Sequence, residues 1–205
     1  MQMTKPNPAF TKERLYLEHA MGHGMPTVIR HLNRYKWAAF HLPKHAAVLD
    51  AGCGSGYGDY ILLNSCDTVV GIDASKEAID YAKWKAEKQK QNRLRYECQD
   101  LSMLDLSETF DAAVCIEVIE HLKEPQQRAF MGRMRRFLKD DGFLLITTPI
   151  KKNDGPMTHF HEREFTRNEF ISFLSEHFTN VILHDPSFWK IPDNFLLAKC
   201  DGVIR

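Results

Sequence analysis

The sequence lacks the features that mark membrane-spanning, secreted and nucleic-acid-binding proteins. No apolar run approaches the roughly 18 residues of a membrane helix, and residues 1–8 lack the apolar core of a signal peptide. Lysine plus arginine number 27, and so do aspartate plus glutamate, so no net charge favours a long nucleic acid as partner. The five cysteines are odd in number and contain no CxxC pair, which indicates reduced thiols rather than a disulfide framework. We therefore expect a cytoplasmic protein without a membrane segment, for which a nucleic-acid partner is not favoured.

After residue 45, strand and helix patterns alternate regularly. Apolar runs predict strands near residues 46–51, 68–73, 93–99, 110–116 and 142–148. Helices are expected between them, near residues 56–65, 75–90 and 126–139. This alternation is typical of an α/β fold, in which helices cover both faces of a parallel sheet.

Local signals mark the helix starts and the last part of the sheet. Ser75 is a plausible N-cap, Pro125 sits just inside a helix start, and Thr166 with Glu169 forms a capping box. Two last strands are expected near residues 180–184 and 195–200. The link between them is too short for a helical crossover, so these strands should be antiparallel to each other.

Glycines at alternate positions follow the first predicted strand: Gly52, Gly54, Gly56 and Gly58. Because glycine has no Cβ, the backbone can turn tightly here and a ligand can lie against bare peptide. The next strand ends in Asp73, from where a carboxylate can accept hydrogen bonds from both hydroxyls of a ribose. A dinucleotide site would have glycine in place of Tyr57, and Asp50 suits an ammonium group better than a pyrophosphate. The pattern predicts a nucleoside-containing cofactor that carries an ammonium group.

The run from Asp50 to Gly56 resembles the first motif of class I S-adenosylmethionine (SAM)-dependent methyltransferases. Further segments resemble the later motifs of this family in the same order: Gly71–Ser75, Glu97–Leu101, Phe110–Leu122 and Asp141–Pro149. The resemblance implies a Rossmann-like, mostly parallel sheet of seven strands in the order 3-2-1-4-5-7-6, with helices on both faces. It also implies a set of SAM-binding residues: Asp50, Gly52, Gly54, Gly56, Asp73, Ala74, Asp100, Leu101, Ile116 and Tyr35.

Residues 1–45 are expected to form a helical lid in front of a SAM-binding domain at residues 46–205. Pro26–Phe40 has apolar residues at helical spacing. The segment His31–Tyr35, preceded by Lys12-Glu-Arg, resembles the leader of methyltransferases from bacterial envelope-polysaccharide clusters, which have glycine in place of Lys12. Such leaders fold over the cofactor, which implies that Arg34 or Tyr35 contacts SAM or substrate. In the alternative interpretation, the aromatic residues only pack the lid.

Candidate catalytic residues follow the fourth and fifth predicted strands, because ligands bind at the carboxyl ends of such sheets. On a helical turn, the spacing of Glu117, Glu120 and His121 would place all three on one face, and His161 follows the fifth strand. Two carboxylates and two imidazoles can bind Mg²⁺ or Mn²⁺. The set is similar to that of the small-RNA 2′-O-methyltransferases, but the envelope-polysaccharide methyltransferases share the pattern.

Three interpretations of these four residues remain open. They form a metal site, they supply a metal-free general base at His121 or His161 with Glu117 in the catalytic set, or they only order the loops. The functions considered are correspondingly three. The preferred one is SAM-dependent methyl transfer to an oxygen of a small polar acceptor, such as a sugar or a quinone-type metabolite. The alternatives are a metal-assisted RNA 2′-O-methyltransferase and a SAM-binding protein without transferase activity.

Overall fold

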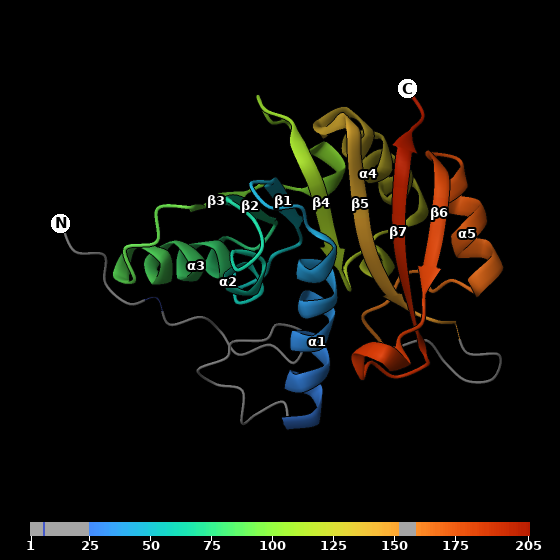
Figure 1. Cartoon of the computed structure of the whole chain (residues 1–205), viewed down its shortest axis with the longest axis horizontal. Helices are drawn as coiled ribbons and strands as arrows, with labels where there is room; N and C mark the ends of the chain where they lie inside the picture. Colours follow the sequence, from blue (N-terminus) through green and yellow to red (C-terminus); the bar gives the residue numbers. More distant parts are fainter. Residues whose placement is uncertain (1–5, 7–24, 152–158) are drawn as a thin grey trace.

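Seven strands form one mixed sheet in the computed structural model, which describes residue 6, residues 25–151 and residues 159–205 (Figure 1). Their order is β3-β2-β1-β4-β5-β7-β6, which confirms the expected α/β topology. Neighbouring strands are parallel from β3 to β5, whereas β7 is antiparallel to both β5 and β6. The strands are β1 (Ala47–Ala51), β2 (Thr68–Asp73), β3 (Leu94–Cys98), β4 (Phe110–Ile116), β5 (Leu138–Pro149), β6 (Phe178–His184) and β7 (Phe195–Val203).

The helices lie close to their predicted positions, with one exception. They are α1 (Met25–His41), α2 (Asp59–Leu62), α3 (Lys76–Lys88), α4 (Glu124–Phe137) and α5 (Arg167–Ser175), with the 3₁₀ turns η2 (Leu101–Met103), η3 (Ile119–His121) and η4 (Ser187–Trp189). The exception is α2, which was expected over residues 56–65 but is a single turn. Gly56 has a φ of +72°, which no helix residue adopts, so the helix begins later. None of the described helices is long and apolar enough to cross a membrane.

The predicted caps are present at the helix starts. The Ser75 side chain accepts a hydrogen bond from the Ala78 amide, and Thr166 and Glu169 cap each other reciprocally. Pro125 lies in the first turn of α4, where its missing amide proton is not needed.

Helices cover both faces of the sheet and leave its strand ends free. The core on one face combines residues of α1, α2 and α3 with alternate strand residues such as Val48. The core on the other face combines α4 and α5 with the intervening strand residues, such as Leu49. Strands buried on both faces read as nearly continuous apolar runs, which is why the sequence locates them well. A ligand can therefore approach the sheet only at an end, beyond the carboxyl ends of the parallel strands.

Candidate cofactor and active site

The glycine-rich loop follows β1, and its glycines meet different requirements. Gly52 has a φ of +91°, and a Cβ there would lie 2.3 Å from a Val118 methyl group. Gly56 has a φ of +72°, and a Cβ there would lie 2.5 Å from the Tyr96 hydroxyl. Gly54 also has a positive φ, of +54°, but a Cβ there would have no neighbour within 4 Å. Bare backbone at Gly54 therefore faces open space, as a ligand-binding loop requires.

Asp73 at the end of β2 holds this loop in place. One of its carboxylate oxygens accepts a hydrogen bond from the Gly54 amide at 3.0 Å, and the other accepts one from the Ser75 amide at 2.8 Å. The parallel pairing of Ala51 with Ile72 brings the ends of β1 and β2 together, as the spacing of the two motifs predicts. An acid fixed in this way has a defined direction.

A cavity of about 420 Å³ lies beyond these strand ends. Most of the residues expected to bind cofactor or to act in catalysis line it: Tyr35, Gly52, Gly54, Asp73, Ala74, Asp100, Leu101, Ile116, Glu117 and His121. Four expected residues are not part of its wall: Asp50, Gly56, Glu120 and His161. Asp100 lies beside η2, where one carboxylate oxygen accepts hydrogen bonds from the Ser102 amide and hydroxyl at 2.8 and 2.7 Å.

Asp50 lies beneath the loop and is fully buried, rather than facing the cavity. It shares the strand face of Val48, which points into the core under α1. Its Oδ2 accepts a hydrogen bond from the Tyr35 hydroxyl at 3.0 Å. Burial raises the pKa of Asp50 to about 6. Asp50 thus does not form part of the cavity wall, where it was expected to meet an ammonium group, and it anchors a residue of α1.

A second buried acid, Asp59 at the start of α2, accompanies Asp50. Burial and the neighbouring Asp50 raise the pKa of Asp59 well above its usual range. Asp50 Oδ1 and both Asp59 oxygens accept no hydrogen bond from the described residues. Two neighbouring buried carboxyls are costly to ionise together, which favours a state in which one of them keeps its proton. We assign that proton to Asp59, whose pKa is raised further.

Helix α1 reaches the cavity through its polar face. His31 and Tyr35 line the wall, and the Tyr57 hydroxyl lies 3.3 Å from His31 Nδ1. The Tyr35 and Tyr57 rings meet edge to face with their centres 5.4 Å apart. Arg34, one position before Tyr35, stacks over the Phe195 ring at 4.0 Å and is almost fully buried. These contacts join α1 to the glycine-rich loop and to β7.

The alternation of side chains along β4 does not continue to Glu117, the residue that follows this strand. Ile116 packs on the face that α1 covers, so a regular strand would direct Glu117 to the opposite face. Its φ is instead +55°, in the left-handed region that costs a non-glycine residue about 1–2 kcal/mol. The Glu117 carboxylate accepts a hydrogen bond from Thr147 Oγ1 at 2.9 Å and lies 3.4 Å from Arg34 Nη2. Burial raises the pKa of Glu117, and Arg34 is the main group that opposes this rise.

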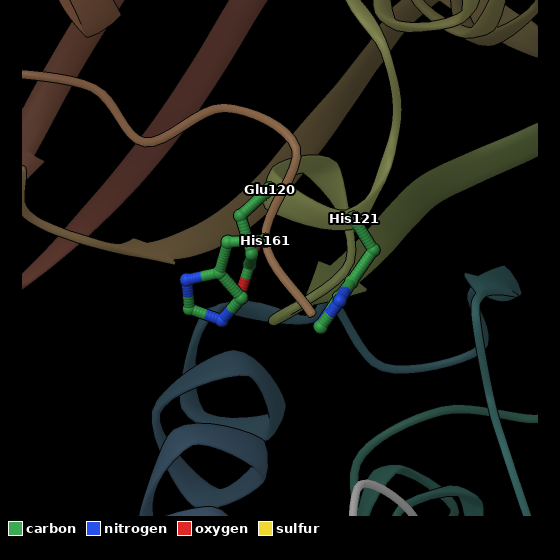
Figure 2. Close-up of side chains that lie close together, drawn as sticks. All are labelled: Glu120, His121 and His161. Atoms are coloured by element: carbon green, nitrogen blue, oxygen red, sulfur yellow. The ribbon is translucent and has the colours of Figure 1, made fainter. Parts of the chain in front are cut away.

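Glu120, His121 and His161 form a separate cluster, in which potential ligand atoms lie within 4.8 Å of one another (Figure 2). Glu120 and His121 belong to η3, and His161 comes from the segment before α5. The amides of Glu162 and Arg163 donate to the Glu120 carbonyl at 2.8 and 3.1 Å, which fixes that segment beside η3. Glu117 is not on this turn, contrary to the expectation that the spacing would place it on one face with the other two.

Hydrogen bonds orient each member of this cluster. Glu120 is buried and accepts from Thr148 Oγ1 at 3.1 Å, and burial raises its pKa well above the usual range. His121 Nδ1 lies 3.0 Å from the Phe160 carbonyl, and His161 Nδ1 lies 2.6 Å from the Glu164 carboxylate. Both partners can only accept, so each Nδ1 carries a proton. In the neutral rings, Nε2 is then left as the acceptor or metal-binding atom.

Comparisons with known proteins agree with this geometry. Residues 48–142 match the family model of a methyltransferase domain. A ubiquinone biosynthesis O-methyltransferase of Coxiella burnetii is 36% identical over 107 residues, 52% of this chain and 44% of that protein. A Mycobacterium tuberculosis protein named as a probable S-adenosylmethionine-dependent methyltransferase is 30% identical over 138 residues, 62% of this chain and 46% of that protein. The chain thus spans a little under half of the length of these relatives.

The fold agrees as well. The solved structure of the DhpI–SAH complex matches with a TM-score of 0.69 and 17% identity, over 92% of this chain and 90% of that one. Residues 48–142 thus carry a methyltransferase domain, and the fold is that of the class I SAM-dependent methyltransferases. The region matched by the family model runs from β1 to the beginning of β5. Helix α1, the His161 segment and the antiparallel strands β6 and β7 lie outside it.

Some residues of the methyltransferase cavity were not expected from the sequence: His31, Cys53, Ser55, Tyr57, Val118, Leu122 and Phe160. Several of them are sequence neighbours of expected residues. Their place in the sequence could therefore have identified them, whereas their residue types could not. Tyr57 is the clearest example, because it stands where a dinucleotide site has glycine and its ring forms part of the wall. Cys53 belongs to the wall, but the residue is almost fully buried, which raises the pKa of its thiol and disfavours a reactive thiolate.

Proposed function

We propose that this methyltransferase moves the methyl group of SAM to an oxygen of a small polar acceptor, a sugar or a related metabolite. The observation that carries the proposal is that one cavity is lined both by Asp73 and the bare Gly54 backbone and by His121. Its volume of about 420 Å³ lies within the range of about 300–1,000 Å³ that is common for small-molecule sites. The printed name of the Coxiella burnetii relative, an O-methyltransferase, supports oxygen as the acceptor atom.

In this proposal, SAM lies across the strand ends with its nucleoside at β2 and β3. Asp73 takes the ribose hydroxyls, and Asp100 with Leu101 takes the adenine. Gly52, Gly54 and Ala74 pass beside the ligand, and Ile116 packs against it. Gly56 shapes the loop from below, where it contacts Tyr96 rather than the cavity.

Methyl transfer is an in-line displacement on a carbon that the sulfonium already activates, so the enzyme must orient the acceptor and remove its proton. We assign proton removal to His121, which lines the cavity and whose Nδ1 is held by the Phe160 carbonyl. Its Nε2 then accepts the hydroxyl proton while the oxygen attacks the methyl carbon. His161, oriented by Glu164, is the alternative base. Glu117 belongs to the same wall but is held by Thr147 and Arg34.

A second candidate is a metal-assisted reaction, which the cluster of Glu120, His121 and His161 favours. The residues fit a divalent cation such as Mn²⁺ or Mg²⁺, because both Nε2 atoms are available and Glu164 supports one imidazole from behind. A cation bound there would lower the pKa of the acceptor hydroxyl. Its acceptor would be the 2′-hydroxyl of an RNA. Glu117, expected as the fourth ligand, is not part of the cluster.

We further propose that residues 1–45 act as a lid on the domain formed by residues 46–205. Helix α1 supports this proposal, because His31 and Tyr35 line the cavity and Tyr35 is hydrogen-bonded to Asp50. The Lys12-Glu-Arg segment of the leader lies outside the described residues. We also propose a cytoplasmic location, which the reduced cysteines support.

The decisive experiment is methyl transfer from labelled SAM to pooled sugar nucleotides, pooled phenols and short RNAs, with chelator or with Mn²⁺. We expect chelator-resistant product with a small acceptor, and loss of this product in His121→Ala. The control is His45→Ala, at an exposed histidine distant in sequence from His121, and it should leave product formation unchanged. Chelator-sensitive activity on RNA would identify the metal-assisted enzyme instead. SAM binding without product from any pool would indicate a SAM-binding protein without transferase activity.

A further inference from the structure

The two edge strands of the sheet, β3 and β6, differ in charge. β3 pairs only with β2, and β6 pairs only with β7, among the strands that the structure describes (Figure 1). β3 carries Arg95 and Glu97, which lie 3.2 Å apart, and Arg95 also pairs with Glu108. Charges on an edge strand oppose pairing with a further strand, because pairing would remove them from water. The seven residues of β6 include no lysine, arginine, aspartate, glutamate or proline.

The edge formed by β6 is open to solvent. Helix α5 packs on one face of the sheet there, and it leaves every residue of β6 after Phe178 at least partly exposed. Ile182 is 53% exposed, which is unusual for a large apolar side chain in a strand. The outward amides and carbonyls of β6 have no ladder partner among the described strands. An exposed, uncharged edge strand of this kind is a template for one more strand.

We propose that β6 pairs antiparallel with β6 of a second copy of this chain, with Ile182 opposite its own copy on the two-fold axis. The two sheets then become one continuous sheet. A two-fold interface is formed by the same surface on both partners, so the surface must be complementary to itself.

The sequence of β6 is self-complementary in this register. Val181 lies opposite Leu183 of the partner subunit, and Asn180 lies opposite His184 of the partner subunit. Apolar residues thus meet apolar residues, polar residues meet polar ones, and no like charges face each other. A register with Val181 on the axis would instead place Asn180 opposite an isoleucine. The match between the strand and its own reverse favours a second copy over an unrelated strand.

Pairing through β6 leaves the cavity free. The cavity lies beyond the ends of β1, β2 and β4, and the strands β5 and β7 separate β4 from β6. β6 runs in the same direction as β4 and β5, because β7 is antiparallel to both β5 and β6. The two-fold axis reverses this direction in the second copy. The two cavities therefore open at opposite ends of the joined strands, and the pairing does not depend on the proposed function.

The test is sedimentation velocity of the full chain over a range of concentrations. We expect the parent to reach twice the mass of one chain. Ile182→Lys places two ammonium groups opposite each other on the axis, and it should raise the dissociation constant of the dimer at least about tenfold. Ile182→Glu alone should do the same. An equal mixture of the two variants should restore the dimer, because each lysine then lies opposite a glutamate.

The matched control is Met103→Lys, at an apolar residue that is 74% exposed and follows β3, the opposite edge strand. It should dimerise like the parent. Should the charged variants fail to fold, Ile182→Cys is the second test. Paired antiparallel residues lie about 4.5–5.5 Å apart between Cα atoms, within reach of a disulfide. Mild oxidation should then give more covalent dimer than it gives in the parent, whose own exposed thiol is Cys98.

Three results would overturn the inference. A parent that is monomeric at every concentration would show that this edge stays open or is covered by another segment or protein. A dimer that survives both charged variants would lie elsewhere on the surface. A mixture that fails to restore the dimer would exclude the register with Ile182 on the axis. Each of these results leaves the proposal of methyl transfer untouched.

Discussion

Replacing Asp50 by asparagine should make the protein less sensitive to rising pH. In the folded parent, burial raises the pKa of this carboxyl from 3.8 to about 6. Between these values the folded chain holds more protons at this site than the unfolded chain does. The contribution of the Asp50 carboxyl to the free energy of unfolding is therefore fully present below about pH 3.8, and it is lost as the pH rises past about 6.

The size of the effect follows from the difference between the folded and unfolded pKa values of Asp50. A pKa change of this size corresponds to about 3 kcal/mol over the whole range, and to about 2–2.5 kcal/mol between pH 4 and pH 7. The free energy of unfolding of Asp50→Asn, relative to that of the parent, should increase by this amount from pH 4 to pH 7. Asp59 acts in the same direction, because a neutral neighbour removes one of the causes that raise its pKa.

Urea unfolding at several pH values measures this difference. Packing changes caused by the amide are nearly the same at each pH, so they cancel when the difference is taken. Asp193→Asn, at an exposed carboxyl, is the matched control and should show no such increase. If Asp50→Asn and the parent lose stability in parallel as the pH rises, the buried-acid reasoning is wrong.

Three further predictions concern the cofactor loop and the lid. Asp73→Ala should weaken S-adenosylhomocysteine binding by at least about tenfold in calorimetry, because it removes charge-assisted hydrogen bonds; unchanged affinity would contradict the ribose assignment. Gly52→Ala should cost about 2–3 kcal/mol in urea unfolding, because it combines a positive φ with a Val118 clash. Gly54→Ala, where a Cβ meets open space, should cost only about 1–2 kcal/mol, and equal losses would contradict this reading. Tyr35→Phe should cost about 1–3 kcal/mol by the same assay, since it removes a donor from the buried Asp50, and a neutral result would show that this bond is unimportant.

The fold was predictable because its strands are apolar on both faces and its turns are marked by glycine. The antiparallel β6–β7 pair and the caps at Ser75 and Thr166 match the expectations from the sequence pattern, and the sheet order matches the one that the family resemblance implies. The extent of α2 was not predictable, because the composition of residues 56–58 does not reveal which glycine adopts a positive φ. The residue pattern indicates that a helix is present, but the backbone conformation of the glycines decides at which residue the helix begins.

The position of a site residue was predictable where the end of a strand alone fixes it, and not where the face of the strand or the backbone conformation after it decides. Asp73 lines the cavity because the end of β2 puts it there. Asp50 does not, because the alternation of β1 turns it into the core, where Tyr35 and Asp59 are its partners. The grouping of Glu117 with Glu120 assumed one continuous helical turn, whereas a positive φ separates them.

The two threonines at the end of β5 have a consequence for how such an enzyme can diversify. Successive strand residues point to opposite faces, and Leu145 and Ile146 already pack in different cores. Thr147 accordingly holds Glu117 on the side of α1, while Thr148 holds Glu120 on the side of the histidines. Substitutions in the histidine cluster can therefore accumulate without disturbing the acid that faces the lid. In the function proposed above, a lineage built on this strand end can exchange one acceptor chemistry for another without altering the acid on the opposite face of the sheet.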